Sequence, residues 1–178
     1  MESVGLGIPN SWFITIIVAI VWLGVMLVYS PFADWLASRW TKKPPHLDSF
    51  RAIQKSKLKL IVGIVLAWIF GGILEELILR GIILKAVQSF LTTLIVASIS
   101  TGLGIIIAAV CAFIIHFYQG LRAMIIIVQL SVLFGILFVV SGYNLWAVIL
   151  CHGLYDTVAF IRFAKKKSKY SDHIKNDL

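Results

Sequence analysis

Long apolar runs separated by short polar stretches make up most of the chain. The first extends from Trp12 to Tyr29, and its only polar side chain is Thr15. Three further runs cover residues 104–118, 123–140 and 145–163. Runs of this kind predict helices that cross a hydrocarbon core roughly 30 Å thick.

Another apolar stretch, from Lys57 to Leu84, is longer than one perpendicular crossing requires. As a single α-helix its 28 residues would extend about 42 Å, and Gly71-Gly72 interrupt it. A break at these glycines, a tilt or a re-entrant half-helix would each absorb the excess length. The pattern therefore predicts an all-α fold, a polytopic transmembrane helical bundle with about five crossings, and leaves open a kinked or re-entrant helix around residues 71–84.

The polar stretches between the runs indicate how the helices begin and end. After Pro31, apolar side chains up to Trp40 repeat at helical spacing with polar ones between them, which predicts a separate amphipathic helix in the membrane interface. Asp48 and Ser49 are typical of residues that cap the start of a helix. Residues 98–104 have the serine and glycine content of a turn.

These elements divide the chain into three parts. Residues 1–50 hold the N-terminal transmembrane and interfacial helices, residues 51–164 the membrane core, and residues 165–178 a basic cytoplasmic tail.

The basic residues predict the orientation in the membrane. Of the 16 Lys and Arg residues, seven lie within residues 39–59 and six within residues 162–175. Basic loops stay on the cytoplasmic side. Because four crossings separate the two basic blocks, we expect the N-terminus outside and the C-terminus inside.

Composition supports the membrane assignment and excludes several other classes of protein. Apolar residues make up 60% of the 178 residues and charged residues 13%, and the mean hydropathy is +0.98. Soluble domains have roughly 45–50% apolar residues and about 25% charged residues. This excludes a disordered chain and a soluble enzyme, and two cysteines are too few for a disulfide-stapled secreted domain. The basic blocks lack interleaved aromatic residues, so we expect contact with anionic lipid headgroups and not with nucleic acid.

Six ionisable residues lie inside the apolar runs. A charged side chain at the bilayer centre costs roughly 2.5–3.5 kcal/mol on insertion scales, so such a set indicates a functional site whose members satisfy one another. Two pairs have the four-residue spacing that brings side chains together on a helix. The six residues are Glu75, Glu76, Arg80, His116, His152 and Asp156, the pairs being Glu76 with Arg80 and His152 with Asp156.

Each of these residues also has a purely structural interpretation. Glu76 and Arg80 could form a buried ion pair that only fixes helix register, and the two histidines could be interhelical hydrogen-bonding residues. Glu75 has no cationic partner at helical spacing, which suits a general base or acid. Two histidines and a glutamate are also a plausible zinc set, although the chain has no His-Glu-x-x-His pair.

The same residues fall in three ordered motifs. Residues 75–81 read Glu-Glu-Leu-Ile-Leu-Arg-Gly, residues 113–120 carry a histidine followed by Phe-Tyr-Gln-Gly, and residues 152–156 read His-Gly-Leu-Tyr-Asp. They resemble the Glu-Glu-x-x-x-Arg, aromatic-then-His and His-x-x-x-Asn/Asp motifs of the CAAX-processing and bacteriocin-processing (CPBP) intramembrane proteases. This family is also called type II CAAX prenyl endopeptidase or lysostaphin-resistance-protein-A-like. The resemblance covers roughly residues 58–163, and Ala112 stands where the family usually has phenylalanine.

The resemblance implies a glutamate-dependent intramembrane endopeptidase. In such an enzyme Glu75 and His116 would activate water, His152 and Asp156 would support the oxyanion, and the pair of Glu76 and Arg80 would support the site. No cofactor or metal is implied, zinc being the less favoured alternative. The expected substrate is a peptide or membrane protein in the cytoplasmic membrane of a prokaryote, and the sequence does not indicate the oligomeric state.

Two rival classes remain open at this point. A non-catalytic bacteriocin-immunity protein or membrane scaffold could retain the motifs without hydrolysing a substrate. A small ion-coupled transporter would also explain intramembrane carboxylates and histidines, but the chain has no inverted repeat of the kind that builds many transporters.

Overall fold

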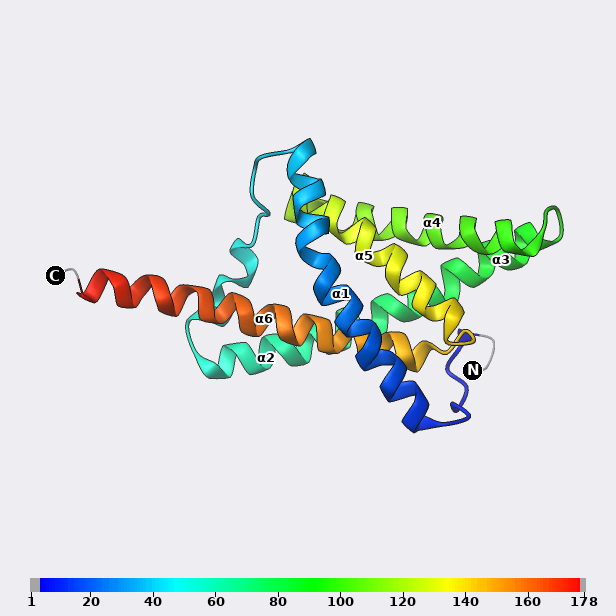
Figure 1. Cartoon of the computed structure of the whole chain (residues 1–178), viewed down its shortest axis with the longest axis horizontal. Helices are drawn as coiled ribbons and strands as arrows, with labels where there is room; N and C mark the ends of the chain where they lie inside the picture. Colours follow the sequence, from blue (N-terminus) through cyan, green and yellow to red (C-terminus); the bar gives the residue numbers. More distant parts are fainter. Residues whose placement is uncertain (1–3, 177–178) are drawn as a thin grey trace.

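The structure, a computed structural model, describes residues 4–176, and the side chains of residues 4–47 and 50–165. Every regular element in this range is a helix (Figure 1). The α-helices are α1 (Trp12–Trp40), α2 (Lys57–Ala67), α3 (Lys85–Thr92), α4 (Ala97–Ile115), α5 (Leu121–Val140) and α6 (Leu145–Asn176). Two π-helices, η3 (Trp68–Glu75) and η4 (Leu77–Leu84), and two 3₁₀-helices, η2 (Asp48–Gln54) and η5 (Phe117–Gln119), complete the set.

The predicted all-α bundle is confirmed. In the described part of the chain, five helices are long and apolar enough to cross a membrane, and large apolar side chains cover their outward surfaces. Outward apolar side chains are what a small bundle surrounded by lipid requires. The five spans are Trp12–Trp40, Lys57–Thr92, Ala97–Ile115, Leu121–Val140 and Leu145–Lys165.

The long second span is one helix that changes its winding. Its 36 residues run from α2 through η3 and η4 to α3 and continue through Gly71-Gly72 without a break. A π-helix closes its hydrogen bonds over five residues instead of four, so it advances less per residue than an α-helix. The π-helical winding therefore shortens this span, and the described residues 57–92 form one continuous helix without a separate re-entrant half-helix.

The separate interfacial helix predicted after Pro31 is instead the continuation of α1. Proline is tolerated inside membrane helices where neighbouring helices pack against them, and the Ser30 hydroxyl next to Pro31 lies 2.8 Å from the Tyr155 hydroxyl of α6. The amphipathic pattern of residues 32–40 therefore reflects packing of α1 against the bundle and not a helix lying in the membrane interface. Ala33 and Ala37 are fully buried against the bundle, while the large aromatic side chains around them face outward.

Two further boundaries differ from those expected. Residues 98–104 lie inside α4, and the chain turns at residues 93–96 instead. Gly104 is buried in α4, where a Cβ would lie only 3.0 Å from the Leu84 carbonyl oxygen. The missing side chain lets the two helices approach closely, as small residues do in membrane proteins. The cap of α2 is Ser56, whose hydroxyl accepts from the Lys59 N–H, whereas Asp48 begins η2.

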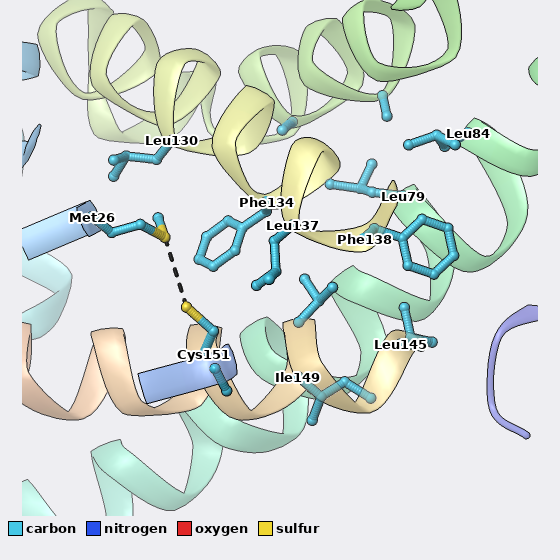
Figure 2. Close-up of a cluster of buried hydrophobic side chains, with 14 residues drawn as sticks. Met26, Leu79, Leu84, Leu130, Phe134, Leu137, Phe138, Leu145, Ile149 and Cys151 are labelled. Carbon is cyan, nitrogen blue, oxygen red and sulfur yellow. Dashed lines mark hydrogen bonds between the residues drawn. The ribbon is translucent and has the colours of Figure 1, made fainter. Parts of the chain in front are cut away.

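The helices form two groups joined by α1. In one group α2 and η3 pack along α6, and in the other α3 and η4 pack along α4, which also lies against α5 (Figure 1). Helix α1 crosses both α5 and α6. Buried side chains from α1, η4, α5 and α6 meet in the core between the groups, Met26, Leu130, Phe134, Leu137 and Cys151 among them (Figure 2).

The linker between α1 and α2 fastens the turn that follows α4. The His46 N–H donates to the Gln119 carbonyl at 2.8 Å. Beside it, Gly120 has a φ of +84°, a conformation that favours glycine, and a Cβ there would lie 3.4 Å from the His46 ring. This contact fixes the end of the helix that carries His116.

Candidate active site

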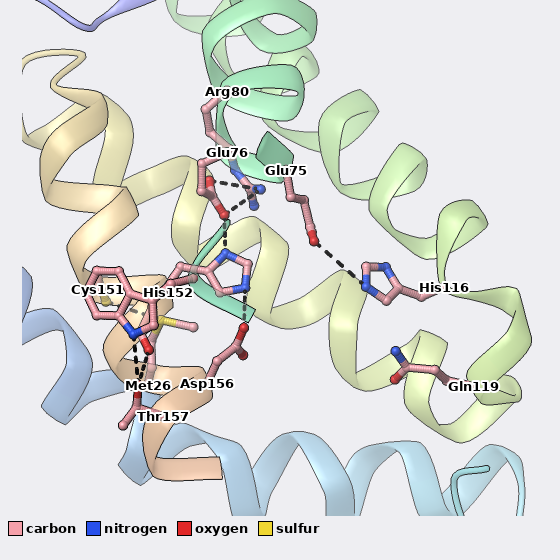
Figure 3. Close-up of polar contacts among 12 residues, drawn as sticks. Met26, Glu75, Glu76, Arg80, His116, Gln119, Cys151, His152, Asp156 and Thr157 are labelled. Carbon is pink, nitrogen blue, oxygen red and sulfur yellow. Dashed lines mark hydrogen bonds and ion pairs between the residues drawn. The ribbon is translucent and has the colours of Figure 1, made fainter. Parts of the chain in front are cut away.

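The structure brings the six ionisable residues of the membrane spans close together in two groups of contacts, one of Arg80, Glu76, His152 and Asp156 and the other of Glu75 and His116. The π-helical region carries Glu75, Glu76 and Arg80, the C-terminal end of α4 carries His116, and α6 carries the remaining two, His152 and Asp156 (Figure 3). Elements far apart in sequence therefore converge on one place in the bundle.

The buried centre of the cluster joins Glu76, Arg80 and His152. Arg80 Nη1 lies 3.2 Å and 3.1 Å from the two oxygens of the Glu76 carboxylate, and His152 Nδ1 lies 2.5 Å from Glu76 Oε1. Glu76 and Arg80 are both fully buried. Close pairing of this kind is what makes buried charges tolerable. The i,i+4 ion pair is as predicted, whereas the bond from Glu76 to His152 was not foreseen.

Helix α5 adds two more contacts to this centre. Arg80 Nη2 donates to the carbonyl oxygen of Ser131 at 2.8 Å and to its hydroxyl at 2.7 Å. The ring of Phe134 stacks on the His152 imidazole with centroids 4.5 Å apart and planes at 22°. Sequence reasoning missed both residues, because a serine and a phenylalanine in an apolar run carry no signal of their own.

Glu75 and His116 face each other at the edge of the cluster. Their nearest atoms, Glu75 Oε2 and His116 Nε2, are 3.9 Å apart, and each side chain is 16% exposed. His116 Nδ1 lies 2.9 Å from the Ala112 carbonyl oxygen. A carbonyl can only accept, so Nδ1 carries a hydrogen, and in the neutral ring Nε2 is the acceptor. Ala112 itself is fully buried in the core.

On α6, His152 and Asp156 form the predicted i,i+4 pair. His152 Nε2 lies 3.6 Å from Asp156 Oδ2, and the carboxylate is 24% exposed. Both ring nitrogens of His152 are thus faced by carboxylates, Nδ1 by Glu76 and Nε2 by Asp156.

Gly71 and Gly72 are packing positions for α6 and not a helix break. A Cβ on Gly71 would lie 2.9 Å from Asp156 Oδ2 and 3.5 Å from His152 Nε2, and one on Gly72 would lie 3.5 Å from the Gly153 backbone. On α6, Gly153 leaves room for the Trp68 ring, whose indole Nε1 donates to Thr157 Oγ1 at 3.0 Å. The glycines let the two helices approach closely enough for the cluster to form.

The side chains described do not include three His, Cys, Asp or Glu residues arranged to hold a metal ion together. The cluster instead consists of a buried group of guanidinium, carboxylate and imidazole contacts and a separate carboxylate–imidazole pair at its edge. Glu75 and His116 can polarise a small molecule, such as water, that lies between them, and the imidazole of His152 lies in the same cluster.

Comparison with protein families decides the class of protein. The model of the type II CAAX prenyl endopeptidase Rce1-like family matches residues 57–158, which is more than half of the chain and includes all six ionisable residues of the site. The chain belongs to this family. Comparisons with curated proteins and with solved structures gave no match.

Rce1-like proteins are CAAX-type endopeptidases, so this chain is an integral-membrane protease with a peptide substrate. Hydrolysis inside a bilayer needs a polar pocket that admits water, a base beside the water and donors where negative charge develops. The ionisable cluster is the place in the described structure that offers such groups together (Figure 3).

Proposed function

We propose that this protein is a glutamate-dependent intramembrane endopeptidase of a prokaryotic cytoplasmic membrane. It hydrolyses a peptide bond in a membrane-associated protein or a peptide, using Glu75 as the general base. The observation that carries the proposal is the 3.9 Å separation between Glu75 Oε2 and His116 Nε2.

A separation above 3.5 Å between two polar groups is suited to a bridging water. Because Nδ1 of His116 holds a hydrogen for the Ala112 carbonyl, Nε2 can accept one from the water while the Glu75 carboxylate accepts the other. Both hydrogens are then directed away from the substrate, and an oxygen lone pair is free to attack its carbonyl carbon. Glu75 takes the proton as the water attacks and returns it to the leaving amine.

His152 supports the negative charge that develops on the carbonyl oxygen. Its Nδ1–H donates to Glu76, and when Nε2 also carries a proton that second N–H is the donor for the oxyanion. Asp156, as a carboxylate, only accepts hydrogen bonds and lies 3.6 Å from His152 Nε2, so it positions His152 without taking the N–H that the oxyanion needs. Glu76 and Arg80 hold the imidazole from the buried side. These roles need no metal or cofactor.

The two basic blocks support an orientation with the N-terminus outside and the C-terminus in the cytoplasm. Residues 39–59 end at the start of the second span and residues 162–175 begin at the end of the last, so four of the five spans lie between the two blocks. Positive charge is retained on the cytoplasmic side. Substrate then reaches the site from the membrane or the cytosol.

The test uses the full-length protein in proteoliposomes and internally quenched peptides ending in Cys-aliphatic-aliphatic-X, with and without a farnesyl group on the cysteine. In ¹⁸O-labelled water, hydrolysis places ¹⁸O in the new carboxyl group. Glu75→Gln keeps the shape of the side chain and removes the base, so activity should fall at least about 100-fold. The matched control is Asp34→Asn, the same change at a half-exposed carboxylate that pairs with Arg122 away from the site.

Full activity in Glu75→Gln would refute the assignment of Glu75. The zinc alternative makes its own prediction in the same assay, namely loss of activity with a chelator and one metal ion per chain by elemental analysis. We expect neither result, because no step assigned to the six residues uses a metal ion.

A further inference from the structure

Helix α5 carries none of the six ionisable residues, yet two of its buried side chains hold the cluster. Ser131 and Phe134 are three residues apart, so both lie on the helix face that points to the site. Each is 4% exposed. Ser131 binds Arg80, and Phe134 stacks on His152.

The stacked ring restricts the imidazole of His152. Rotation about the Cβ–Cγ bond would swing Nδ1 away from Glu76 and Nε2 away from Asp156, and with planes only 22° apart it would also drive the imidazole into the phenyl ring. The guanidinium carbon of Arg80 lies 5.5 Å from the centroid of the same ring. Phe134 therefore contacts both groups that flank the Glu76 carboxylate.

We propose that Phe134 is a positioning residue for the hydrolysis, fixing the plane of His152 so that its Nε2–H is directed at the oxyanion. This inference rests on the proposed function. A group that acts on the oxyanion stabilises the transition state more than the bound substrate, so its loss lowers kcat and leaves KM nearly unchanged.

A neighbouring phenylalanine supplies the matched control. Phe138 is on the same helix and is fully buried in the same core (Figure 2). It packs edge-on against Tyr143, with centroids 5.4 Å apart and planes at 85°. Its ring makes no stacking contact with the site histidine. Replacing either residue by leucine removes the same ring from the same core, and only the change at Phe134 removes the stacking on His152.

The experiment measures kcat and KM for the farnesylated quenched peptide with full-length variants in proteoliposomes, and the thermal unfolding midpoint of each. Phe134→Leu and Phe134→Met should lower kcat about 3- to 10-fold, the range that loss of one aromatic pair implies, with KM within about twofold. Phe134→Tyr keeps the ring face and should restore most of kcat. Phe138→Leu should lower the unfolding midpoint as much as Phe134→Leu does while keeping kcat near that of the wild type.

Equal kcat values for Phe134→Leu and Phe138→Leu would overturn the inference, and so would a rise in KM with kcat unchanged. Glu75→Gln is run alongside to separate this result from failure of the proposed function. If Glu75→Gln is inactive and Phe134→Leu behaves like its control, the positioning role alone is wrong. If Glu75→Gln is fully active, the proposed function is wrong.

Discussion

Gly71 offers a direct test of how tightly the two helices must approach at the site. In Gly71→Ala the new methyl group would lie 2.9 Å from Asp156 Oδ2 and 3.5 Å from His152 Nε2. It adds no charge and removes no hydrogen bond. The substitution therefore changes only the space that is left for the pair on α6.

The expected loss of activity follows from this distance. An ordinary contact of a Cβ begins at 3.4 Å, so Asp156 or the helix that carries it must move by about 0.5 Å. A misplacement of about 1 Å at a catalytic group can cost about 100-fold in rate, so we expect roughly a tenfold loss in kcat. Helix propensity favours alanine over glycine by up to about 1 kcal/mol, which offsets part of the strain in the folded state.

The control is Gly24→Ala on α1, where the added Cβ would meet nothing within 4 Å. Both variants are reconstituted and compared by kcat on the quenched peptide and by thermal unfolding. We expect Gly24→Ala to keep full activity and Gly71→Ala to lose activity while remaining folded. Wild-type activity in Gly71→Ala would show that the contact between η3 and α6 does not set the geometry of the site, and the steric reasoning would then be wrong.

Two further substitutions separate the buried centre of the cluster from its edge. Arg80→Met leaves the buried Glu76 carboxylate without its guanidinium partner and should destabilise the fold by about 3–5 kcal/mol. Asp34→Asn breaks a half-exposed pair that is worth at most about 1 kcal/mol. Chemical denaturation measures the free energy of unfolding of both variants, and similar losses would contradict the expected difference. Asp156→Asn keeps the size and polarity of the side chain beside His152, so kcat should stay within about tenfold of the wild type, whereas Asp156→Leu removes the polar neighbour and should lose about 100-fold or more. Equal activity in the two variants would show that His152 needs no partner at this position.

The sequence predicts the parts of the site that depend on short-range geometry. The pairs of Glu76 with Arg80 and of His152 with Asp156 follow from helical spacing, and the structure shows both. The bond from Glu76 to His152 joins residues that are 76 positions apart in the sequence, on different helices. Its existence depends on the close packing of Gly72 against Gly153, which no periodic pattern indicates.

The incorrect expectations share a physical origin. Pro31 and the segment 98–104 contain residues that break helices in water, which predicts helix ends there, and Gly71-Gly72 leave a break open as one alternative. Within the bilayer every backbone group must be bonded inside the segment, so the helix persists through such residues. The small side chains are then used at contacts between helices, as Gly104 is against Leu84.

The π-helical winding of residues 68–84 bears on how this family member can tolerate changes in length. A π-turn is an α-helical turn with one additional residue. Deleting one residue between Trp68 and Gly71 would allow an ordinary α-helix there, and the span would keep its backbone hydrogen bonds and remain long enough to cross the membrane. Because a π-turn and an α-turn each complete one rotation, the segments on either side of the deletion would keep their faces, and Trp68 would still lie over Gly153. The same deletion in an ordinary α-helical stretch turns one side by roughly 100° relative to the other. The π-helical residues are therefore the place where this span can lose a residue without displacing Glu75.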